Sequence, residues 1–284
     1  VLSAGGSTIA WYENDGGATP SFTPRTITSS ALGARSVYAA DLDGDGDIDV
    51  LSASSGDDTI AWYENDGGAT PSFTPRTITT SAGRLPSVYA TDIDGDGDTD
   101  ILSNESAGGN TIAWYENDGR ADPSFTSRTI STSADDVWSI FAADLDGDGD
   151  LDVLSASGIF SDDTIAWYEN DGGADPSFTE RTITTSANGA QSVYAADIDG
   201  DGDTDVLSDE SAGDDTIAWY ENDGRADPSF TERTITTSAF GVQSVYATDL
   251  DGDGDTDVLS AFFFSDDTIA WYENTRITSA APPT

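Results

Sequence analysis

The sequence predicts an all-β protein, a β-propeller built from four-stranded antiparallel blades, and three observations support this prediction. The phrase WYEN occurs six times, at intervals of 51 to 53 residues. An Asp-rich phrase, D-x-D-G-D-G-D-x-D, occurs five times at a fixed place in the same period. The segments between these phrases are short and rich in β-branched and aromatic residues, and none shows a helical apolar period. Repeats of about 50 residues are typical of propeller blades.

A single repeat, residues 36–80, shows the expected order of strands. Strands are predicted at 36–40, 49–53, 59–64 and 73–79, where Val, Ile, Thr, Tyr and Trp are concentrated. The Asp-rich phrase joins the first strand to the second, and the turn sequence Asn-Asp-Gly-Gly joins the third strand to the fourth. Four short strands connected in this way form one antiparallel blade.

The copies of the WYEN strand indicate the number of blades. Six copies predict six blades, with five or seven as the alternatives. The first blade is expected to lack its first strand, and the last repeat is shortened. We expect the ring to close, or to pair with another chain, because an unpaired strand edge promotes aggregation. The chain is interpreted as one propeller domain, residues 1–284, with repeats approximately at 1–35, 36–86, 87–138, 139–191, 192–243 and 244–284.

The chain is strongly acidic. Its 54 acidic and 10 basic residues give a formal net charge of −44. Such a charge repels nucleic acid and anionic membrane surfaces, so nucleic-acid binding is not expected. Membrane insertion is not expected either, because no apolar run approaches the roughly 20 residues that span a bilayer. The charge attracts cations, and solvation in concentrated salt is the alternative explanation for part of it.

The sequence contains no Cys and no His, which limits the metals and the reactions that it can support. No disulfide can hold the fold, so its stability must come from the core or from bound metal. Zinc, copper and iron–sulfur centres prefer His or Cys, which leaves hard cations with oxygen ligands. Lys is absent too, so the usual catalytic bases and nucleophiles are missing, and the acidic pairs recur in every repeat. The protein is therefore not expected to be an enzyme.

The Asp-rich loop has the pattern of a calcium site. In the copy at 41–49, carboxylates stand at positions 1, 3, 5 and 9, and glycine at position 6 permits a sharp turn. Position 7 is expected to bind through its backbone carbonyl, with its carboxylate facing solvent. Calcium takes six to eight oxygens at flexible distances and suits this pattern better than magnesium. A solvated acidic turn, the alternative, would not require glycine at the same position in every copy.

About five calcium ions are expected, one for each complete loop. The predicted ligands are Asp41, Asp43, Asp45, Asp47 and Asp49 in the first loop, Asp92, Asp94, Asp96, Asp98 and Asp100 in the second, Asp144, Asp146, Asp148, Asp150 and Asp152 in the third, Asp197, Asp199, Asp201, Asp203 and Asp205 in the fourth, and Asp249, Asp251, Asp253, Asp255 and Asp257 in the fifth.

The repeat resembles the FG-GAP/VCBS family of calcium-binding β-propellers, which also occurs in integrin α-subunit headpieces and in some fungal lectins. The matching phrase is VYAA at 37–40, running into the Asp-rich loop at 41–49 and then Val-Leu at 50–51. The resemblance covers nearly the whole chain and implies that the loop between the first two strands of each blade binds calcium. The copies are more alike than is usual in this family, which suggests recent duplication or design.

The connecting loops fall into two groups. Those between the first and second strands, and between the third and fourth, barely vary among the copies, whereas the other two groups of loops vary widely. A four-stranded blade places these groups on opposite faces, so the variable face is the predicted binding face, with drift in unconstrained loops as the alternative. The candidate ligand-binding residues on it are the aromatic residues Trp138, Phe160, Phe262, Phe263 and Phe264. The repeated Trp of WYEN is instead expected in the core between blades, with sugar stacking as the alternative.

These observations together predict a calcium-binding, calcium-stabilised propeller that acts as a non-catalytic recognition or adhesion module. A lectin-like carbohydrate-binding protein and a purely structural or engineered symmetric scaffold are the alternatives, so the candidate partners besides calcium are a carbohydrate or a protein. An extracellular location, secreted or at the cell surface, is expected because such loops in extracellular modules bind calcium at about 10⁻⁴–10⁻³ M, which cytosolic calcium would not fill.

Overall fold

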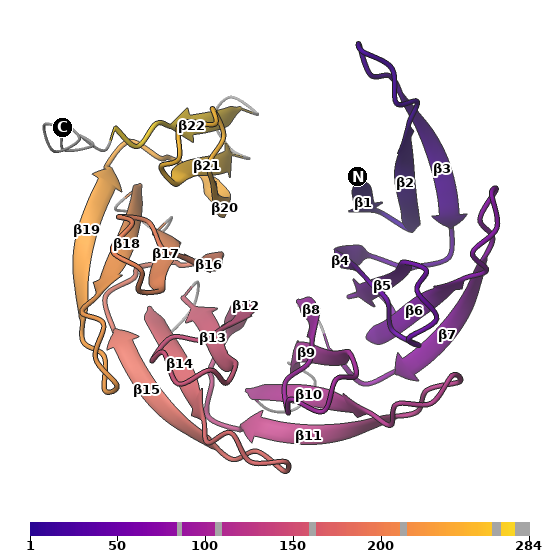
Figure 1. Ribbon diagram of the computed structural model, residues 1–284, viewed down its shortest axis with the longest axis horizontal. Helices are drawn as coiled ribbons and strands as arrows, with labels where there is room; N and C mark the ends of the chain where they lie inside the picture. Colours follow the sequence, from indigo (N-terminus) through magenta and orange to yellow (C-terminus); the bar gives the residue numbers. More distant parts are fainter. Residues whose placement is uncertain (84–86, 106–109, 159–162, 211–214, 263–267, 276–284) are drawn as a thin grey trace, which may run out of the picture.

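The computed structural model describes residues 1–83, 87–105, 110–158, 163–210, 215–262 and 268–275. Within these ranges the regular secondary structure consists of β-strands alone, and the strands form six antiparallel sheets around a common axis (Figure 1). The chain is therefore an all-β propeller of six blades, as the sequence predicts. In the described part of the chain, no helix has the length and apolarity needed to cross a membrane.

The strands run in chain order across each blade. The first blade contains β1 (Leu2–Gly5), β2 (Thr8–Asn14) and β3 (Phe22–Thr28). The second blade contains β4 (Ala34–Ala40), β5 (Asp49–Ser54), β6 (Thr59–Asn65) and β7 (Phe73–Thr79), and the third contains β8 (Val88–Thr91), β9 (Asp100–Glu105), β10 (Thr111–Asn117) and β11 (Phe125–Ser131). The fourth blade contains β12 (Val137–Ala143), β13 (Asp152–Ser157), β14 (Thr164–Asn170) and β15 (Phe178–Thr184). The fifth blade contains β16 (Val193–Ala196), β17 (Asp205–Glu210), β18 (Thr216–Asn222) and β19 (Phe230–Thr236). The sixth blade contains β20 (Val242–Thr248), β21 (Asp257–Phe262) and β22 (Ile269–Tyr272).

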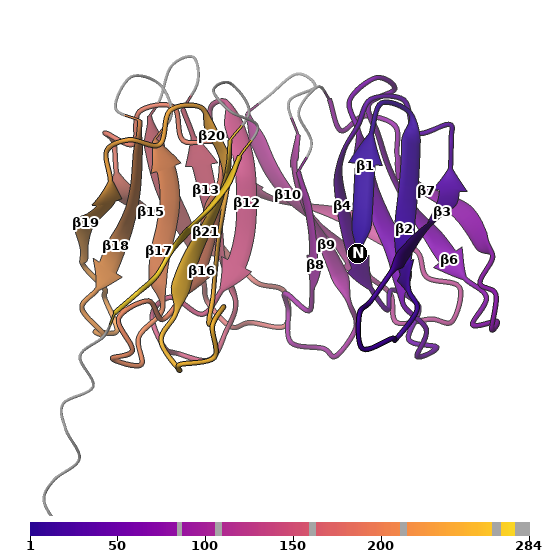
Figure 2. The same ribbon diagram turned by 90° about the horizontal axis from the view of Figure 1, so that it is seen from above.

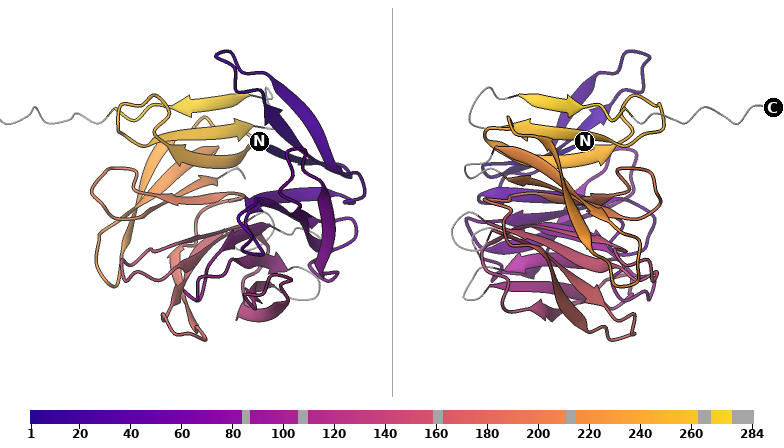
Figure 3. Two further views of the ribbon diagram at one scale, coloured as in Figure 1. Left: turned by 45° about the vertical axis from the view of Figure 1, so that its right-hand side comes forward. Right: turned by 90° about the vertical axis from the view of Figure 1, so that its left-hand side faces the viewer.

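The first and sixth blades are each one strand short in the described part of the chain. The first blade lacks the innermost strand, as the sequence predicts, and the sixth lacks the outermost one. These two blades flank an opening in the ring (Figure 1), and Figure 3 shows the same propeller from two further directions.

The four groups of loops lie on two faces (Figure 2). On one face, the Asp-rich loop meets the turn between the third and fourth strands, because a Cβ atom added to Gly67 would lie 1.9 Å from Asp47 Oδ2. On the other face, the loop after β5 bonds to the loop before β4: Ser55 N donates to the carbonyl of Gly33 at 3.0 Å. The variable loops therefore share one face, as predicted.

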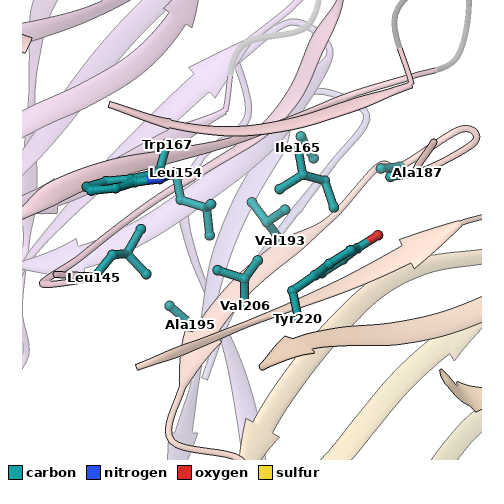
Figure 4. Close-up of a cluster of buried hydrophobic side chains, with 11 residues drawn as sticks. Leu145, Leu154, Ile165, Trp167, Ala187, Val193, Ala195, Val206 and Tyr220 are labelled. Carbon is teal, nitrogen blue, oxygen red and sulfur yellow. The ribbon is translucent and has the colours of Figure 1, made fainter. Parts of the chain in front are cut away.

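The core lies between neighbouring blades. In β6, Ile60 and Trp62 point to one side and pack against Val88 and Tyr115 of the following blade. The same joint recurs between the fourth and fifth blades, where Ile165 and Trp167 face Val193 and Tyr220 (Figure 4). The repeated tryptophans Trp62, Trp114 and Trp167 are only 2–3% exposed, so the prediction that this Trp is a core residue is confirmed for these three blades.

A line of aromatic rings follows the inner wall of the propeller. The innermost strands β4, β8, β12, β16 and β20 each contribute one ring, and the centroids of successive rings lie 4.6–4.8 Å apart at a tilt. Tilted pairs at this spacing are favourable for aromatic rings. The contributing residues are Tyr38, Tyr89, Phe141, Tyr194 and Tyr246.

Candidate metal centre

Five clusters of carboxylates lie on the face that carries the Asp-rich loops. In each cluster, ligand oxygens of three aspartates lie within 4.8 Å of one another. Positions 1 and 3 of the loop take part every time, and position 5 or position 9 completes the set. The clusters are Asp41 with Asp43 and Asp45; Asp92 with Asp94 and Asp96; Asp144 with Asp146 and Asp152; Asp197 with Asp199 and Asp205; and Asp249 with Asp251 and Asp257.

The loop is shaped by hydrogen bonds from its own backbone. Asp41 Oδ1 accepts from Gly44 N at 2.8 Å, and Asp41 Oδ2 accepts from Gly46 N at 3.0 Å. Both glycines have positive φ, +72° and +93°, which bends the chain around the Asp41 carboxylate in a way that L-residues rarely allow. Asp45 Oδ1 accepts from Asp47 N at 2.8 Å and continues the turn. The carboxylates are thus held on the inside of the loop.

Position 9 attaches the loop to the sheet. Asp49 is buried, and its two carboxylate oxygens accept from Leu42 N at 3.0 Å and from Asn65 N at 2.8 Å. The corresponding pair of bonds recurs in the other four loops. Each oxygen keeps a second lone pair, so the carboxylate can accept these bonds and also face a cation.

Like charges are concentrated in these loops without a cation among the side chains. The pKa of Asp49 is raised to about 6 and that of Asp100 to about 7, chiefly by burial and to a smaller extent by neighbouring carboxylates, while backbone N–H donors act in the opposite direction. Burial, together with the nearby carboxylates of Asp45 and Asp41, also raises the pKa of Asp43. A divalent cation would offset this repulsion. Because every donor is an oxygen and several ligands come from one short loop, the residues fit calcium.

Position 7 lies outside the clusters. The Asp47 carboxylate lies against Gly67 of the neighbouring turn, so this turn covers part of a side chain that was expected to face solvent, and Asp47 is half-buried. The same approach recurs at Gly119 with Asp98, Gly172 with Asp150 and Gly224 with Asp203. The Asn-Asp-Gly that follows each of the first five WYEN strands was the available sequence signal for this contact. The spacing within the Asp-rich loop alone could not reveal it.

The opposite, variable face has a hollow at the propeller axis. The hollow has a volume of about 280 Å³ and is lined by residues at or just before the innermost strands, namely Arg35, Ser36, Ser87, Trp138, Gln191, Ser192, Gln243 and Ser244. The guanidinium of Arg35 lies 5.5 Å from the ring centroid of Trp138, and Gln243 Nε2 donates to Gln191 Oε1 at 2.9 Å. Among the described arginines, only Arg35 has no ion pair with an acidic residue.

The structure separates the candidate ligand-binding aromatics. Trp138 lines the axial hollow, and its indole Nε1 is buried without a hydrogen-bond partner in the described part of the chain. Phe262 is instead the last residue of β21, paired in register with Val242, and it packs partly buried on the core between the last two blades. The prediction that Phe262 lies in a loop is therefore wrong, because β21 extends one residue beyond the expected end of the strand. Phe160, Phe263 and Phe264 lie outside the described residues.

Comparison with known proteins assigns the repeat to a family. The family model of the FG-GAP-like repeat matches residues 1–52, 41–103, 92–155, 155–208 and 211–260, so the chain belongs to this family. The fold is similar to the crystal structure of AofleA from Arthrobotrys oligospora, with a TM-score of 0.51 and 13% identity over 93% of this chain and 78% of that chain. At this identity the similarity concerns the fold alone. No curated protein matches the sequence.

Proposed function

We propose that the protein is a calcium-binding, calcium-stabilised propeller that acts as a non-catalytic, extracellular recognition or adhesion module. The observation that carries this proposal is the recurrence of the same oxygen-only carboxylate cluster at the same place in five blades. The hydrogen bonds that hold each loop in shape support it, because they arrange the ligands before the ion binds. The lack of His, Cys and Lys supports a non-catalytic role.

Calcium in these loops would stabilise the joints between blades as well as the loops. The residue after the first aspartate, Leu42 in the second blade, is buried, and its carbonyl accepts a hydrogen bond from Asn117 Nδ2 of the next blade at 2.9 Å. An ion bound by Asp41 and Asp43 would therefore fix the segment to which the next blade is attached. Because the ion binds only the folded loop, the free energy of unfolding rises with calcium concentration.

Thermal unfolding followed by circular dichroism tests the calcium proposal. The midpoint is measured in EDTA and then with increasing calcium at fixed ionic strength, with titration calorimetry to count the ions. A saturable rise and about five ions are expected. The variant Asp43→Asn should lower the number of ions by one, whereas Asp57→Asn, outside every cluster, should not. A midpoint that responds to calcium no more than to sodium chloride of equal ionic strength would contradict the proposal.

The axial hollow supports recognition of a small polar ligand, with a carbohydrate as the favoured class. An indole, an arginine, two amides and several hydroxyl groups converge there, and such groups hydrogen-bond and stack on sugars. The position at or just before the start of the innermost strand differs between most repeats that are otherwise near copies, as Arg35, Trp138 and Gln191 illustrate. This local loss of symmetry distinguishes the hollow from the scaffold around it.

A glycan array of the wild-type protein and of Trp138→Ala tests the ligand. Specific binding that is lost in Trp138→Ala, and kept in Phe240→Ala, is the expected result, because Phe240 is exposed on the same face but does not line the hollow. Binding to no glycan, or binding that is indifferent to Trp138, would remove the support for a carbohydrate ligand and favour a scaffold without a ligand on this face.

A further inference from the structure

The joints between blades repeat one hydrogen bond. The asparagine at or just after the end of the third strand of a blade donates from Nδ2 to a carbonyl in the Asp-rich loop of the blade before it. The four bonds are Asn117 to Leu42 at 2.9 Å, Asn170 to Ile93 at 3.0 Å, Asn222 to Leu145 at 2.7 Å and Asn274 to Ile198 at 2.8 Å. Each bond fixes the register between two successive blades.

The apolar part of the joint is equally regular. Each blade offers its Ile and Trp to the following blade, and the following blade offers its Tyr and a Val or Ile of its innermost strand in return. In the joint of Figure 4, Ile165 and Trp167 lie on one side and Val193 and Tyr220 on the other. A blade therefore has two different faces, an Ile/Trp face and a Tyr face, and each binds the opposite face of a neighbour.

The sixth blade presents its Ile/Trp face at the opening of the ring. Ile269 is 76% exposed and Trp271 is 46% exposed, whereas Ile60 and Trp62 in the second blade are 0% and 3% exposed. Leu250 is 46% exposed, while its counterparts in the other loops are 1–6% exposed. Within the described residues, no asparagine donates to the Leu250 carbonyl. The exposed surface of the sixth blade therefore has the residues that form a joint elsewhere, but no neighbouring blade covers it within the described residues.

The first blade presents the complementary face on the other side of the opening. Tyr12, the counterpart of Tyr220, is 36% exposed, whereas Tyr220 is 2% exposed. Among the residues that the structure describes, β1 pairs only with β2, so its inner edge offers backbone donors and acceptors to a further strand. An unpaired edge of this kind readily accepts another strand.

We propose that these two surfaces dock one further blade of this same repeat. Such a blade would place its Tyr on Trp271 and Ile269 and donate its Asn to the Leu250 carbonyl. Its Ile/Trp face would cover Tyr12. The surfaces continue an interface that the chain already builds at five joints, four of them with the asparagine bond, so the occupant is specified by the same contacts. Val1 occupies the repeat position of Val206, so a second copy of residues 206–257 joined ahead of Val1 would keep the period of the repeat.

A second copy of residues 206–257, fused to the protein, provides a further blade with which to test the proposal. It contains the second, third and fourth strands of a blade, followed by an innermost strand and an Asp-rich loop. Fused in phase ahead of Val1, it would fill the opening with three strands and add the absent inner strand beside β1. The comparison is made in saturating calcium between the 284-residue protein and this fusion, so it does not depend on whether calcium stabilises the fold.

Hydrogen exchange of β22 and β1, read by mass spectrometry, gives the first measurement. We expect exchange in both strands to slow at least about tenfold in the fusion, which should stay monomeric in sedimentation. The matched control carries Tyr220→Ala and Asn222→Ala in the added copy alone and should lose this protection. Trp271→Ser should lower the midpoint of the fusion by clearly more than it lowers the midpoint of the unfused protein, in which this side chain is half exposed.

Two outcomes overturn the proposal. The first is unchanged exchange in β22 of the fusion, or protection that persists in the matched control, since either means that the added blade does not use this face. The second is concentration-dependent dimerisation of the unfused protein with protection of β22, because a second copy would then be the occupant.

Discussion

At the scale of single residues, Asp209 illustrates how one substitution between repeats changes stability. Its side chain is fully buried, Oδ1 accepts from Gln191 N at 2.9 Å and Ser192 N at 2.7 Å, and Oδ2 has no hydrogen-bond partner in the described part of the chain. The third blade has Asn104 at this position, and its amide donates to the carbonyl of Val137 of the next blade at 2.6 Å. The Asp209 carboxylate therefore accepts backbone hydrogen bonds as an asparagine would, but it has no N–H group to donate to the next blade.

Asp209→Asn should stabilise the protein, and the gain should depend on pH. Burial raises the pKa of Asp209 from 3.8 to about 7. Between these two pH values the folded state therefore keeps a proton on Asp209 that the unfolded state has lost. Stability is therefore lost as pH rises from about 4 to 7 and stays low above 7. We expect a gain of at most about 4 kcal/mol at pH 8 and nearly none at pH 4, measured by urea unfolding in saturating calcium.

The reciprocal variant Asn104→Asp is the control for this prediction, and it should acquire a cost of the same sign with the same pH dependence. Equal stabilities of wild type and Asp209→Asn at pH 4 and pH 8 would show that Asp209 is already compensated in the folded state.

Gly67 supports a second prediction at this scale, with Gly16 as its control. Both glycines occupy the same turn of the repeat, with φ of +62° and +67°. A Cβ atom on Gly67 would lie 1.9 Å from Asp47 Oδ2, whereas a Cβ atom on Gly16 would meet nothing within 4 Å. Gly16→Ala should cost about 1 kcal/mol from backbone strain alone, and Gly67→Ala clearly more. Denaturant unfolding measures both, and equal losses would mean that the Asp47 side chain moves away freely.

At the scale of elements, the sequence predicts the strands well and the contacts between loops poorly. The strands expected at 49–53 and 73–79 are observed as β5 (Asp49–Ser54) and β7 (Phe73–Thr79), because alternating apolar residues and turn sequences act locally. The packing of Asp47 on Gly67, and that of Arg35 on Trp138, involves residues from different loops or blades. A local pattern can mark each of the two segments, but it does not say which segments meet in the fold.

The same limit applies to the candidate sites. The carboxylates of each calcium loop gather as the spacing predicts, because the ligands lie within nine residues of one chain segment. The axial hollow is built from five blades, so only Trp138 among its lining residues was identified from the sequence as a candidate. Phe262 was misplaced because three consecutive Phe residues give no signal for where the strand ends.

The asparagine joint gives a prediction for whole blades. Asn117 Nδ2 donates to Leu42 O in the preceding blade and to Thr99 O in its own blade. Within the described ranges, Asn65 Nδ2 donates only to Ile48 O in its own blade. Asn117→Ala leaves the buried Leu42 carbonyl unsatisfied, so it should destabilise by about 1–3 kcal/mol more than Asn65→Ala. Denaturant unfolding in saturating calcium makes the comparison. Equal losses would mean that the joint is held by apolar contacts alone.

At the scale of the whole molecule, the acidic charge and the calcium loops make separate contributions that salt can distinguish. Five calcium ions add ten positive charges to the formal −44 and leave −34, so most of the surface repulsion remains when the loops are filled. Sodium chloride at 1 M shortens the Debye length to about 3 Å and screens charges on the surface. It does not replace an ion held among carboxylates that lie within 4.8 Å of one another, some of them buried.

The stabilisation by calcium should therefore persist in 1 M sodium chloride, although more calcium will be needed to reach it. Salt alone should raise the unfolding midpoint gradually and without saturation, because it weakens repulsion spread over the whole surface. Calcium should add a saturable increment to that rise, because the ion contacts only the folded loops. Differential scanning calorimetry over a grid of both salts measures the two effects. If the increment vanished in 1 M sodium chloride, the Asp-rich loops would serve solvation, and the acidic composition would be an adaptation to salt rather than to calcium.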